Sequence, residues 1–165
     1  MMTISTGDKV PAATLMTLGA DGPAPVALAD KLANRKVIIF AVPGAFTPTC
    51  DSAHVPSFIR TKDAFMAEGV DEIICVSVND PWVMNAWGDT TGANTAGVTM
   101  LSDPSSDFTT AIGMNFDAPP VGFKSRSARY AMLVEDGTVK ILHLEEANGT
   151  CERSGGEAML AALKA

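Results

Sequence analysis

The chain has 165 residues, of which 47% are hydrophobic and 19% are charged, and its formal net charge is -7. This balance predicts one compact domain over residues 1–165 and argues against disorder. The negative charge gives no electrostatic reason to bind nucleic acid or an anionic membrane. No apolar run approaches the ~20 residues that cross a bilayer. The opening MMTISTGDKVPAATL lacks the basic and apolar regions of a signal peptide, so we expect a cytoplasmic protein.

The first half of the chain predicts two buried strands with a helix between them. Residues 5–30 are rich in Gly, Pro and Ala and predict turns, short strands and loop. Lys36–Val42 is a continuous apolar run, which indicates a strand buried on both faces. Residues 51–67 carry apolar side chains at helical spacing and predict a helix that Gly69 ends. Glu72–Val78 is a second apolar run and predicts a second buried strand.

The next segments predict shorter elements. Asp80–Gly88 has the pattern of a helix with an Asp cap and a proline at its first position. Val98–Leu101 predicts a short strand, Ser105–Ile112 a short helix, and Asn115–Ser127 a loop.

The last part of the chain predicts a hairpin and a helix. Tyr130–Glu135 and Thr138–Leu144 flank an Asp-Gly pair, which is a strong hairpin signal. Gly156–Leu163 predicts the closing helix. The whole order predicts an α/β thioredoxin-like fold, in which helices flank a central mixed β-sheet.

Three cysteines occur, Cys50, Cys75 and Cys151. An odd and sparse count is not a disulfide framework. No CxxC pair occurs, and the two histidines, His54 and His143, lie far apart in the sequence. We therefore expect no metal site.

Cys50 stands in the most informative segment, VPGAFTPTCD, between the first buried strand and the helix. Free N–H groups and the helix dipole favour a thiolate at a helix N-terminus, and the thiolate is the nucleophile. Thr47 stands where a disulfide oxidoreductase has a second cysteine, and its hydroxyl can hydrogen-bond an oxygen but cannot form a disulfide. Pro43 stiffens the turn and Gly44 permits close backbone approach. The alternative, that Cys50 is only a small buried apolar residue, does not account for this context.

Several segments together resemble one family. PGAFTPTC resembles the active-site signature of peroxiredoxins, in the type II branch that includes plant type II and vertebrate "type five" enzymes. GDKVPAATL, CVSVNDPWVMNAWG, LSDPSSDF and SRSARYAMLVEDGTVK are similar to further segments of that branch, in the same order. The resemblance covers nearly the whole chain and implies a thiol-dependent peroxidase, an antioxidant oxidoreductase without metal, flavin or haem.

The resemblance also implies roles for single residues. Cys50 is expected to attack the peroxide, and Thr47 to hydrogen-bond both peroxide and sulfur. Pro43 is expected to shield the pocket. Arg129 is expected beside Cys50, where a guanidinium stabilises the thiolate and the leaving oxygen. Gly44 and Phe46 are expected to contact the substrate together with Thr47 and Arg129. Arg126 is the rival cation, but the family pattern places the key arginine directly before the aromatic, here Tyr130.

The expected reaction converts hydrogen peroxide or an organic hydroperoxide and leaves a sulfenic acid on Cys50. A second thiol then regenerates the enzyme. Cys151, in the polar stretch NGTCERSGG, is the better internal candidate for that thiol, although it falls a few residues early for the branch, while Cys75 has the pattern of a buried strand residue. We favour an external thiol, either glutaredoxin with glutathione or thioredoxin. We also expect a homodimer, with Phe46 and Trp82 as candidate contact residues that are equally compatible with the core.

Other interpretations remain open at this level. His54 follows Cys50 by one helical turn and could tune the thiolate, although we expect it to hydrogen-bond locally. A thioredoxin-type disulfide oxidoreductase requires a CxxC pair, and Thr47 occupies its first position. A cysteine hydrolase requires a histidine base with an orienting partner. A non-enzymatic redox-sensing or holdase domain is compatible with the same fold.

Overall fold

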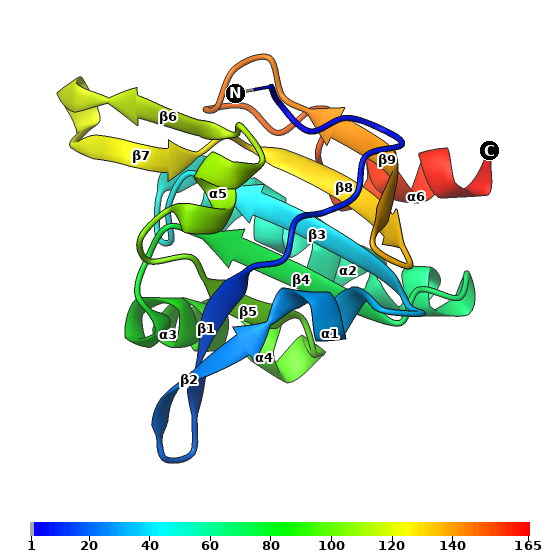
Figure 1. The fold of residues 1–165 in the computed structure, drawn as a ribbon, viewed down its shortest axis with the longest axis horizontal. Coiled ribbons are helices and arrows are strands. Elements are labelled where there is room, and N and C mark those ends of the chain that lie inside the picture. The colour runs from blue at the N-terminus through cyan, green and yellow to red at the C-terminus, as the bar shows by residue number, and fades with distance from the viewer. Residues whose placement is uncertain (1) are drawn as a thin grey trace.

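The computed structural model describes residues 2–165. They form a seven-stranded mixed sheet with helices around it (Figure 1). The strands lie in the order β2-β1-β5-β4-β3-β8-β9. The three central strands β3, β4 and β5 are parallel, and the pairs β3–β8, β8–β9, β1–β5 and β1–β2 are antiparallel. The strands of this sheet are β1 (Thr14–Gly19), β2 (Gly22–Ala27), β3 (Lys36–Val42), β4 (Glu72–Ser77), β5 (Thr99–Ser102), β8 (Tyr130–Glu135) and β9 (Thr138–Leu144). The predicted α/β fold with a central mixed sheet is confirmed.

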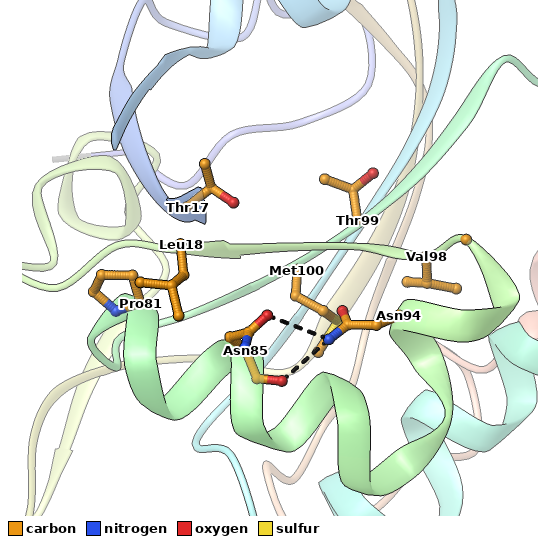
Figure 2. Close-up of a pocket in the computed structure, with 9 residues that line it drawn as sticks. Thr17, Leu18, Pro81, Asn85, Asn94, Val98, Thr99 and Met100 are labelled. Atoms are coloured by element: carbon orange, nitrogen blue, oxygen red, sulfur yellow. Dashed lines mark hydrogen bonds between the residues drawn. The ribbon is translucent and has the colours of Figure 1, made fainter. Parts of the chain in front are cut away.

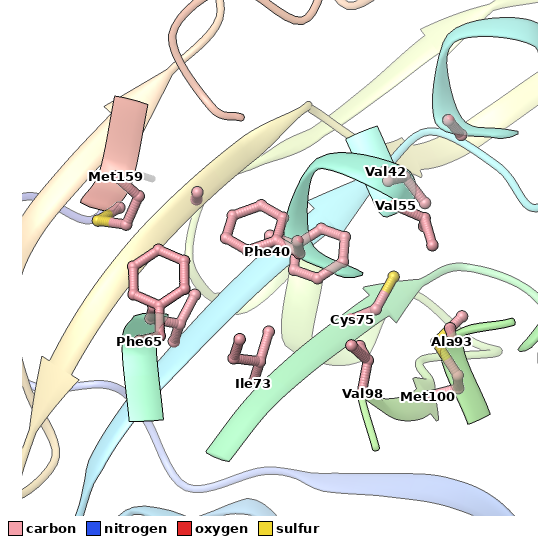
Figure 3. Packing of buried hydrophobic residues seen from close by; sticks show 14 of the residues in the cluster. Phe40, Val42, Val55, Phe65, Ile73, Cys75, Ala93, Val98, Met100 and Met159 are labelled. Carbon is pink, nitrogen blue, oxygen red and sulfur yellow. The ribbon is translucent and has the colours of Figure 1, made fainter. Parts of the chain in front are cut away.

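Strand β3 is apolar from Val37 to Val42 because helices cover both faces of the sheet. Its residues alternate between two hydrophobic clusters, so that Ile38, Phe40 and Val42 face one layer and Val37 and Ile39 face the other. The helices α2 (Val55–Ala67), α3 (Pro81–Thr91), α4 (Ala93–Ala96) and α6 (Gly156–Lys164) contribute to the first cluster. The helices α1 (Leu28–Leu32) and α5 (Asp107–Ala111) contribute to the second. Figure 3 shows the first cluster, with aromatic rings stacked beside the thiol of Cys75.

Local sequence signals account for several element ends. The side chain of Asp80 accepts a hydrogen bond from the Val83 amide at 2.9 Å and caps α3, as its spacing predicts. Asp136 and Gly137 have φ values of 47° and 77°, the left-handed pair that a tight hairpin between β8 and β9 requires. Gly69, with φ of 86°, follows the end of α2. No helix among residues 2–165 combines the length and apolarity that crossing a bilayer demands.

The prediction of a loop over Asn115–Ser127 is wrong. This segment forms a separate two-stranded hairpin of β6 (Asn115–Ala118) and β7 (Phe123–Ser127), joined through a 3-10 turn, η2 (Pro119–Val121). Its prolines and glycine conceal the short strands, and the pairing is irregular. Interactions between the strands hold it together: the Asp117 carboxylate accepts the Ser125 amide at 2.6 Å, and two phenylalanine rings meet edge to face. Such contacts are not visible in local sequence.

The helix that follows the Cys50 segment has an unusual first turn. Cys50–His54 forms a π-helical turn, η1, which continues into α2. A π-turn accommodates one extra residue and is frequent at functional sites. The segment is therefore helical from Cys50 to Ala67, one residue earlier than predicted. The turn places both Cys50 and His54 on its buried side.

Candidate active site

The sulfur of Cys50 is fully buried at the start of η1, just beyond the carboxyl end of β3. Two donors meet it from different parts of the chain. The Thr47 hydroxyl lies 2.9 Å from Sγ, and Nη2 of Arg129 lies 3.0 Å from it. Charge-assisted hydrogen bonds of this kind stabilise negative charge on sulfur. The structure thus brings together the nucleophile, the hydroxyl and the cation that the sequence singled out.

Thr47 has two acceptors for one proton. Its Oγ1 lies 2.7 Å from the Gly44 carbonyl oxygen as well as 2.9 Å from the sulfur of Cys50. A hydroxyl carries a single hydrogen, so it donates to only one of them at a time. When the proton lies toward Gly44, the Thr47 oxygen is free to accept a hydrogen bond from another donor. The hydroxyl can therefore either donate to the Cys50 sulfur or accept beside it.

Arg129 is 1% exposed and lies between β7 and β8. Its guanidinium is held at three points: Nε donates to the Asn148 carbonyl at 3.0 Å, Nη1 to His54 Nδ1 at 3.0 Å, and Nη2 to Cys50. Its backbone N–H donates to the Asn148 side chain at 3.1 Å. Across residues 2–165 it forms no salt bridge. A surface ion pair is therefore not its role.

His54 is fully buried and bonds to distant segments, so the expectation of a local hydrogen bond is wrong. Its Nε2 lies 2.9 Å from the Ser154 carbonyl oxygen, and its Nδ1 faces Arg129. Burial, and then the positive charge of Arg129, lowers the pKa of His54 to about 3. The ring is therefore neutral at pH 7, with Nε2–H donating to Ser154 and Nδ1 accepting from the guanidinium. The spacing of four residues from Cys50 was a usable signal, because it places both side chains on one side of the turn.

The loop that meets His54 is itself anchored by Glu145. The Glu145 carboxylate accepts hydrogen bonds from the amides of Glu152, Arg153 and Ser154 and from the Ser154 hydroxyl, at 2.6–3.2 Å. Burial alone would raise the pKa of Glu145, but the hydrogen bonds, led by those from Ser154, lower it. Nothing in the local sequence pattern distinguishes this carboxylate. It orders the segment that carries the carbonyl partner of His54.

A hydrogen bond also ties η1 to α3. The indole N–H of Trp87, which is fully buried, donates to the Asp51 carboxylate at 2.9 Å. Asp51 directly follows Cys50, so the core tryptophan is bonded to the turn that carries the sulfur. Sequence reasoning did not anticipate this contact.

An open pocket of about 500 Å³ leads to this cluster. Pro43, Thr47 and Arg129 line it, and the hairpin supplies an apolar wall of Phe116, Ala118, Val121 and Phe123. The two donors beside the sulfur therefore face the same pocket as this apolar wall. Gly44 and Phe46, two of the expected substrate contacts, are not among the lining residues. Gly44 contributes through its carbonyl, and Phe46 is half exposed.

The other cysteines lie in different surroundings. Cys75 is fully buried in β4, and burial raises the pKa of its thiol well above the usual value. Cys151 is half-buried, and burial raises the pKa of its thiol although Ser154 and Arg129 act against that rise. All three cysteines are free thiols. Within residues 2–165 no three His, Cys, Asp or Glu side chains are grouped to hold a metal ion.

A second pocket, between β1, α3 and β5, lacks reactive groups (Figure 2). Its polar side chains include Asn85 and Asn94, and the amide of Asn94 donates to both the carbonyl and the side chain of Asn85. No titratable or nucleophilic side chain lines it.

Comparison with known proteins agrees with this geometry. The family model described as Redoxin matches residues 5–160. Peroxiredoxin-2E-2, chloroplastic, of Oryza sativa subsp. japonica is 48% identical over 98% of this chain and 73% of its own length. Peroxiredoxin-2B of Arabidopsis thaliana is 42% identical over 95% of this chain and 92% of its own. The chain belongs to the peroxiredoxin family.

The solved structures point to the same family. Reduced Prx3 from Vibrio vulnificus, in complex with hydrogen peroxide, is 43% identical, has a TM-score of 0.90, and is matched over 98% of this chain and 99% of its own. The peroxiredoxin resembles the type II branch, as the sequence motifs indicated. It is a thiol peroxidase, an antioxidant oxidoreductase that acts on hydroperoxides.

Proposed function

We propose that Cys50 is the peroxidatic cysteine and that it reduces hydrogen peroxide and organic hydroperoxides in antioxidant defence and redox homeostasis. One observation carries the assignment: the Cys50 sulfur accepts hydrogen bonds from both Thr47 and Arg129, at 2.9 and 3.0 Å, and both of these donors line an open pocket. The relative solved with hydrogen peroxide supports the substrate class.

The proposed reaction is a displacement at oxygen. The Cys50 thiolate attacks one peroxide oxygen, the S–O bond forms as the O–O bond breaks, and the second oxygen leaves as hydroxide or alkoxide, which takes up from solvent the proton that the thiol released. Cys50 becomes a sulfenic acid. Arg129 and the Thr47 hydroxyl stabilise the negative charge shared by sulfur and oxygen during the transfer. Pro43 shapes and shields the pocket.

His54 acts on this reaction through Arg129. Because the neutral ring accepts from Nη1, it directs Nη2 toward the sulfur without adding a competing positive charge. His54 is thus a positioning residue. Both ring nitrogens are engaged, so the ring is not available as the base that a cysteine hydrolase would need.

Recycling requires a second thiol, and we propose an external one. It attacks the sulfenic sulfur, water leaves, and a further thiol releases Cys50 by disulfide exchange. Glutaredoxin with glutathione or thioredoxin would supply these thiols. Cys75 is enclosed in β4 and Cys151 is half-buried, with raised pKa values that disfavour attack by either. Mass spectrometry of peroxide-treated protein tests this: a mixed disulfide at Cys50 is expected, and a Cys50–Cys151 or Cys50–Cys75 crosslink would contradict it.

The central experiment measures peroxide consumption with glutaredoxin plus glutathione and with thioredoxin supplied separately. Turnover by the unaltered protein is expected to disappear in Cys50→Ser, because a hydroxyl is not ionised near pH 7. Retained turnover in C50S would refute the assignment. An insulin-reduction assay on the same samples separates the thioredoxin-type alternative, which predicts activity there. A redox-sensing or holdase domain predicts oxidation of Cys50 without repeated turnover.

We also propose that residues 1–165 act as one domain, in a homodimer in the cytoplasm or an equivalent reducing compartment, without nucleic acid or membrane partners. The shared sheet and the match over residues 5–160 support one domain. Phe46 and Trp82 are 50% and 60% exposed, which suits a subunit contact. Three free thiols suit a reducing compartment. Sedimentation of the unaltered protein and of Trp82→Lys tests the dimer: a dimer that W82K weakens is expected, and a monomer contradicts it.

A further inference from the structure

Arg126 does not contact the Cys50 sulfur, yet from the hairpin it contacts the loop that carries Pro43. Its Nη1 donates to the Pro43 carbonyl oxygen at 3.1 Å. Its guanidinium carbon lies 4.8 Å from the centre of the Phe123 ring, which lines the pocket. A planar cation stacked on an aromatic face is held in orientation as well as in place. Arg126 therefore connects the β6–β7 hairpin with the loop that shapes the site.

An irregularity in the hairpin lies directly at this arginine. The pairing of β6 with β7 places Phe116 opposite Arg126, and the register shifts immediately afterwards, between Phe116 and Ala118. Ser125, the residue before Arg126, has φ of 48°, a conformation that costs free energy for a residue with a side chain. Bulges near active sites redirect side chains. Here the bulge precedes the one hairpin side chain that bonds to the Pro43 loop.

The Arg126 guanidinium occupies the space that a side chain at Gly44 would take. A Cβ atom at Gly44 would lie 2.7 Å from Nη1 of Arg126, closer than real Cβ contacts come, and 3.1 Å from Cγ2 of Thr47. Gly44 does not have a positive φ. A side chain at position 44 would therefore displace the Arg126 guanidinium from its present place.

The Pro43–Gly44 peptide also affects the Thr47 hydroxyl beside the Cys50 sulfur. The Pro43 carbonyl accepts from Arg126, and the next carbonyl along the chain, that of Gly44, accepts from the Thr47 hydroxyl at 2.7 Å. Fixing the first carbonyl restrains the orientation of the second. The Thr47 oxygen, which lies 2.9 Å from the sulfur, is restrained with it.

We infer that Arg126 is a positioning residue for peroxide reduction: from the hairpin it holds the Pro43–Gly44 peptide and thereby restrains the position of the Thr47 hydroxyl oxygen beside the sulfur and the substrate. The inference rests on the proposed peroxidatic role of Cys50. It assigns the hairpin, which forms no part of the central sheet, a function in the active site. Loss of Arg126 should impair reaction with a peroxide more than reaction with a reagent that does not use Thr47.

The first experiment compares two second-order rates at Cys50 at one pH, with hydrogen peroxide and with iodoacetamide. In Arg126→Met, which keeps an apolar stem without a donor, the peroxide rate is expected to fall about tenfold, as one lost hydrogen bond would give. The iodoacetamide rate should stay within about twofold. Arg126→Lys, which keeps a donor, should recover part of the peroxide rate. Lys124→Ala removes one charge from an exposed position of the same strand and should leave both rates unchanged.

The second experiment is a double-mutant cycle between positions 44 and 126. Gly44→Ala should slow the peroxide reaction strongly in the unaltered background, because its methyl group collides with Nη1. In Arg126→Ala that space is empty, so the same substitution should cost at least about threefold less, the coupling expected of residues in contact. Effects that multiply independently would overturn the inference. So would R126M slowing both reagents equally, or slowing neither.

These outcomes are distinct from a failure of the proposed function. If the unaltered protein does not consume peroxide, or does so in C50S, the peroxidatic assignment fails. If it consumes peroxide through Cys50 while R126M matches K124A in both rates, only the inference about Arg126 fails.

Discussion

Cys50 and Cys75 are both fully buried, and both belong to the same hydrophobic cluster on one face of the sheet. Cys75 lies within β4, paired in register with Phe40 of β3, and Figure 3 shows it among aliphatic and aromatic side chains. Cys50 lies just past the end of β3, where the chain turns and polar groups can approach. The two thiols therefore share a degree of burial and differ in what surrounds them.

The difference teaches that burial alone does not decide whether a thiol reacts. Burial raises the pKa of Cys75 well above its usual value, because no donor there compensates the lost hydration. Around Cys50 the Thr47 hydroxyl and the Arg129 guanidinium replace water as donors. A pocket opens beside those donors. The carboxyl end of a strand supplies this environment, and the strand interior cannot.

The largest expected difference between the two sites is in alkylation. Iodoacetamide at pH 7 should modify Cys50 at least ~1,000-fold faster than Cys75, because the thiolate is the reactive form and Cys75 must first be exposed by unfolding. Peptide mapping of briefly treated protein measures both rates. Comparable labelling of the two cysteines would break the contrast between the sites.

Removal of the Arg129 guanidinium should make the Cys50 thiol less reactive, and so more like the thiol of Cys75. We expect Arg129→Gln to lower kcat/KM for hydrogen peroxide by about 10²–10³-fold, the usual loss for a preorganised donor at a reacting centre. Arg129→Lys should be almost as impaired, because one ammonium cannot bond to Cys50, His54 and Asn148 together. Stopped-flow measurement of Cys50 oxidation tests this, and a loss below threefold in both variants would contradict it.

His54 makes stability depend on pH in the acidic range, where the Cys75 thiol does not titrate. Its pKa is about 3 in the folded protein and near 6.5 when unfolded, so between these values the unfolded chain binds the extra proton. Stability is therefore present above pH 6.5 and is lost as the pH falls. From pH 6.5 to pH 5 we expect a loss of about 1–2 kcal/mol in the free energy of unfolding.

Urea denaturation at those two pH values measures the effect. His54→Asn keeps an acceptor for Arg129 but cannot titrate, so its stability should change little over the interval. The carboxylates Glu72 and Glu145 have lowered pKa values and lose their contribution at more acidic pH, which is why the interval ends at pH 5. An equal slope in H54N would show that another group titrates.

The smallest effect is expected at Cys75 itself. Cys75→Ala removes a sulfur from the core and should cost about 1 kcal/mol of stability, with peroxide turnover within about twofold of the unaltered protein. Steady-state turnover and urea denaturation measure the two quantities. A large loss of turnover with little loss of stability would give Cys75 a redox role and remove the distinction drawn between the thiols.

The sequence predicted those parts of the fold that depend on local pattern. Lys36–Val42 was predicted at its observed limits, because an apolar run this short, Val37 to Val42 after Lys36, does not reach the length of a typical buried helix and matches that of a buried strand. The Asp-Gly turn and the Asp80 cap were equally visible, since each depends on one or two residues. The β6–β7 hairpin was not, because contacts such as that between Asp117 and Ser125 hold it together rather than any periodicity.

The residues of the candidate site also fall into two groups, those that the sequence indicated and those that it could not. The motif around Cys50 indicated Thr47, and the resemblance of the segment before Tyr130 implied Arg129; the structure places both within 3.0 Å of the sulfur. The motif could not indicate that His54 bonds to Arg129 and Ser154, residues 75 and 100 positions away. Nor could it show Arg126 on the Pro43 carbonyl. Contacts that depend on how two separate segments pack have no local signature.

The bond between Trp87 and Asp51 gives the protein an internal optical reporter. Indole emission responds to its hydrogen-bonding partner and to nearby charge, and this indole is tied to the residue that follows the reacting sulfur. Only one other tryptophan is present, Trp82, and it is 60% exposed. A change of η1 during a catalytic cycle should therefore appear as a change in the buried fluorophore, and the reaction can be followed in real time without a label.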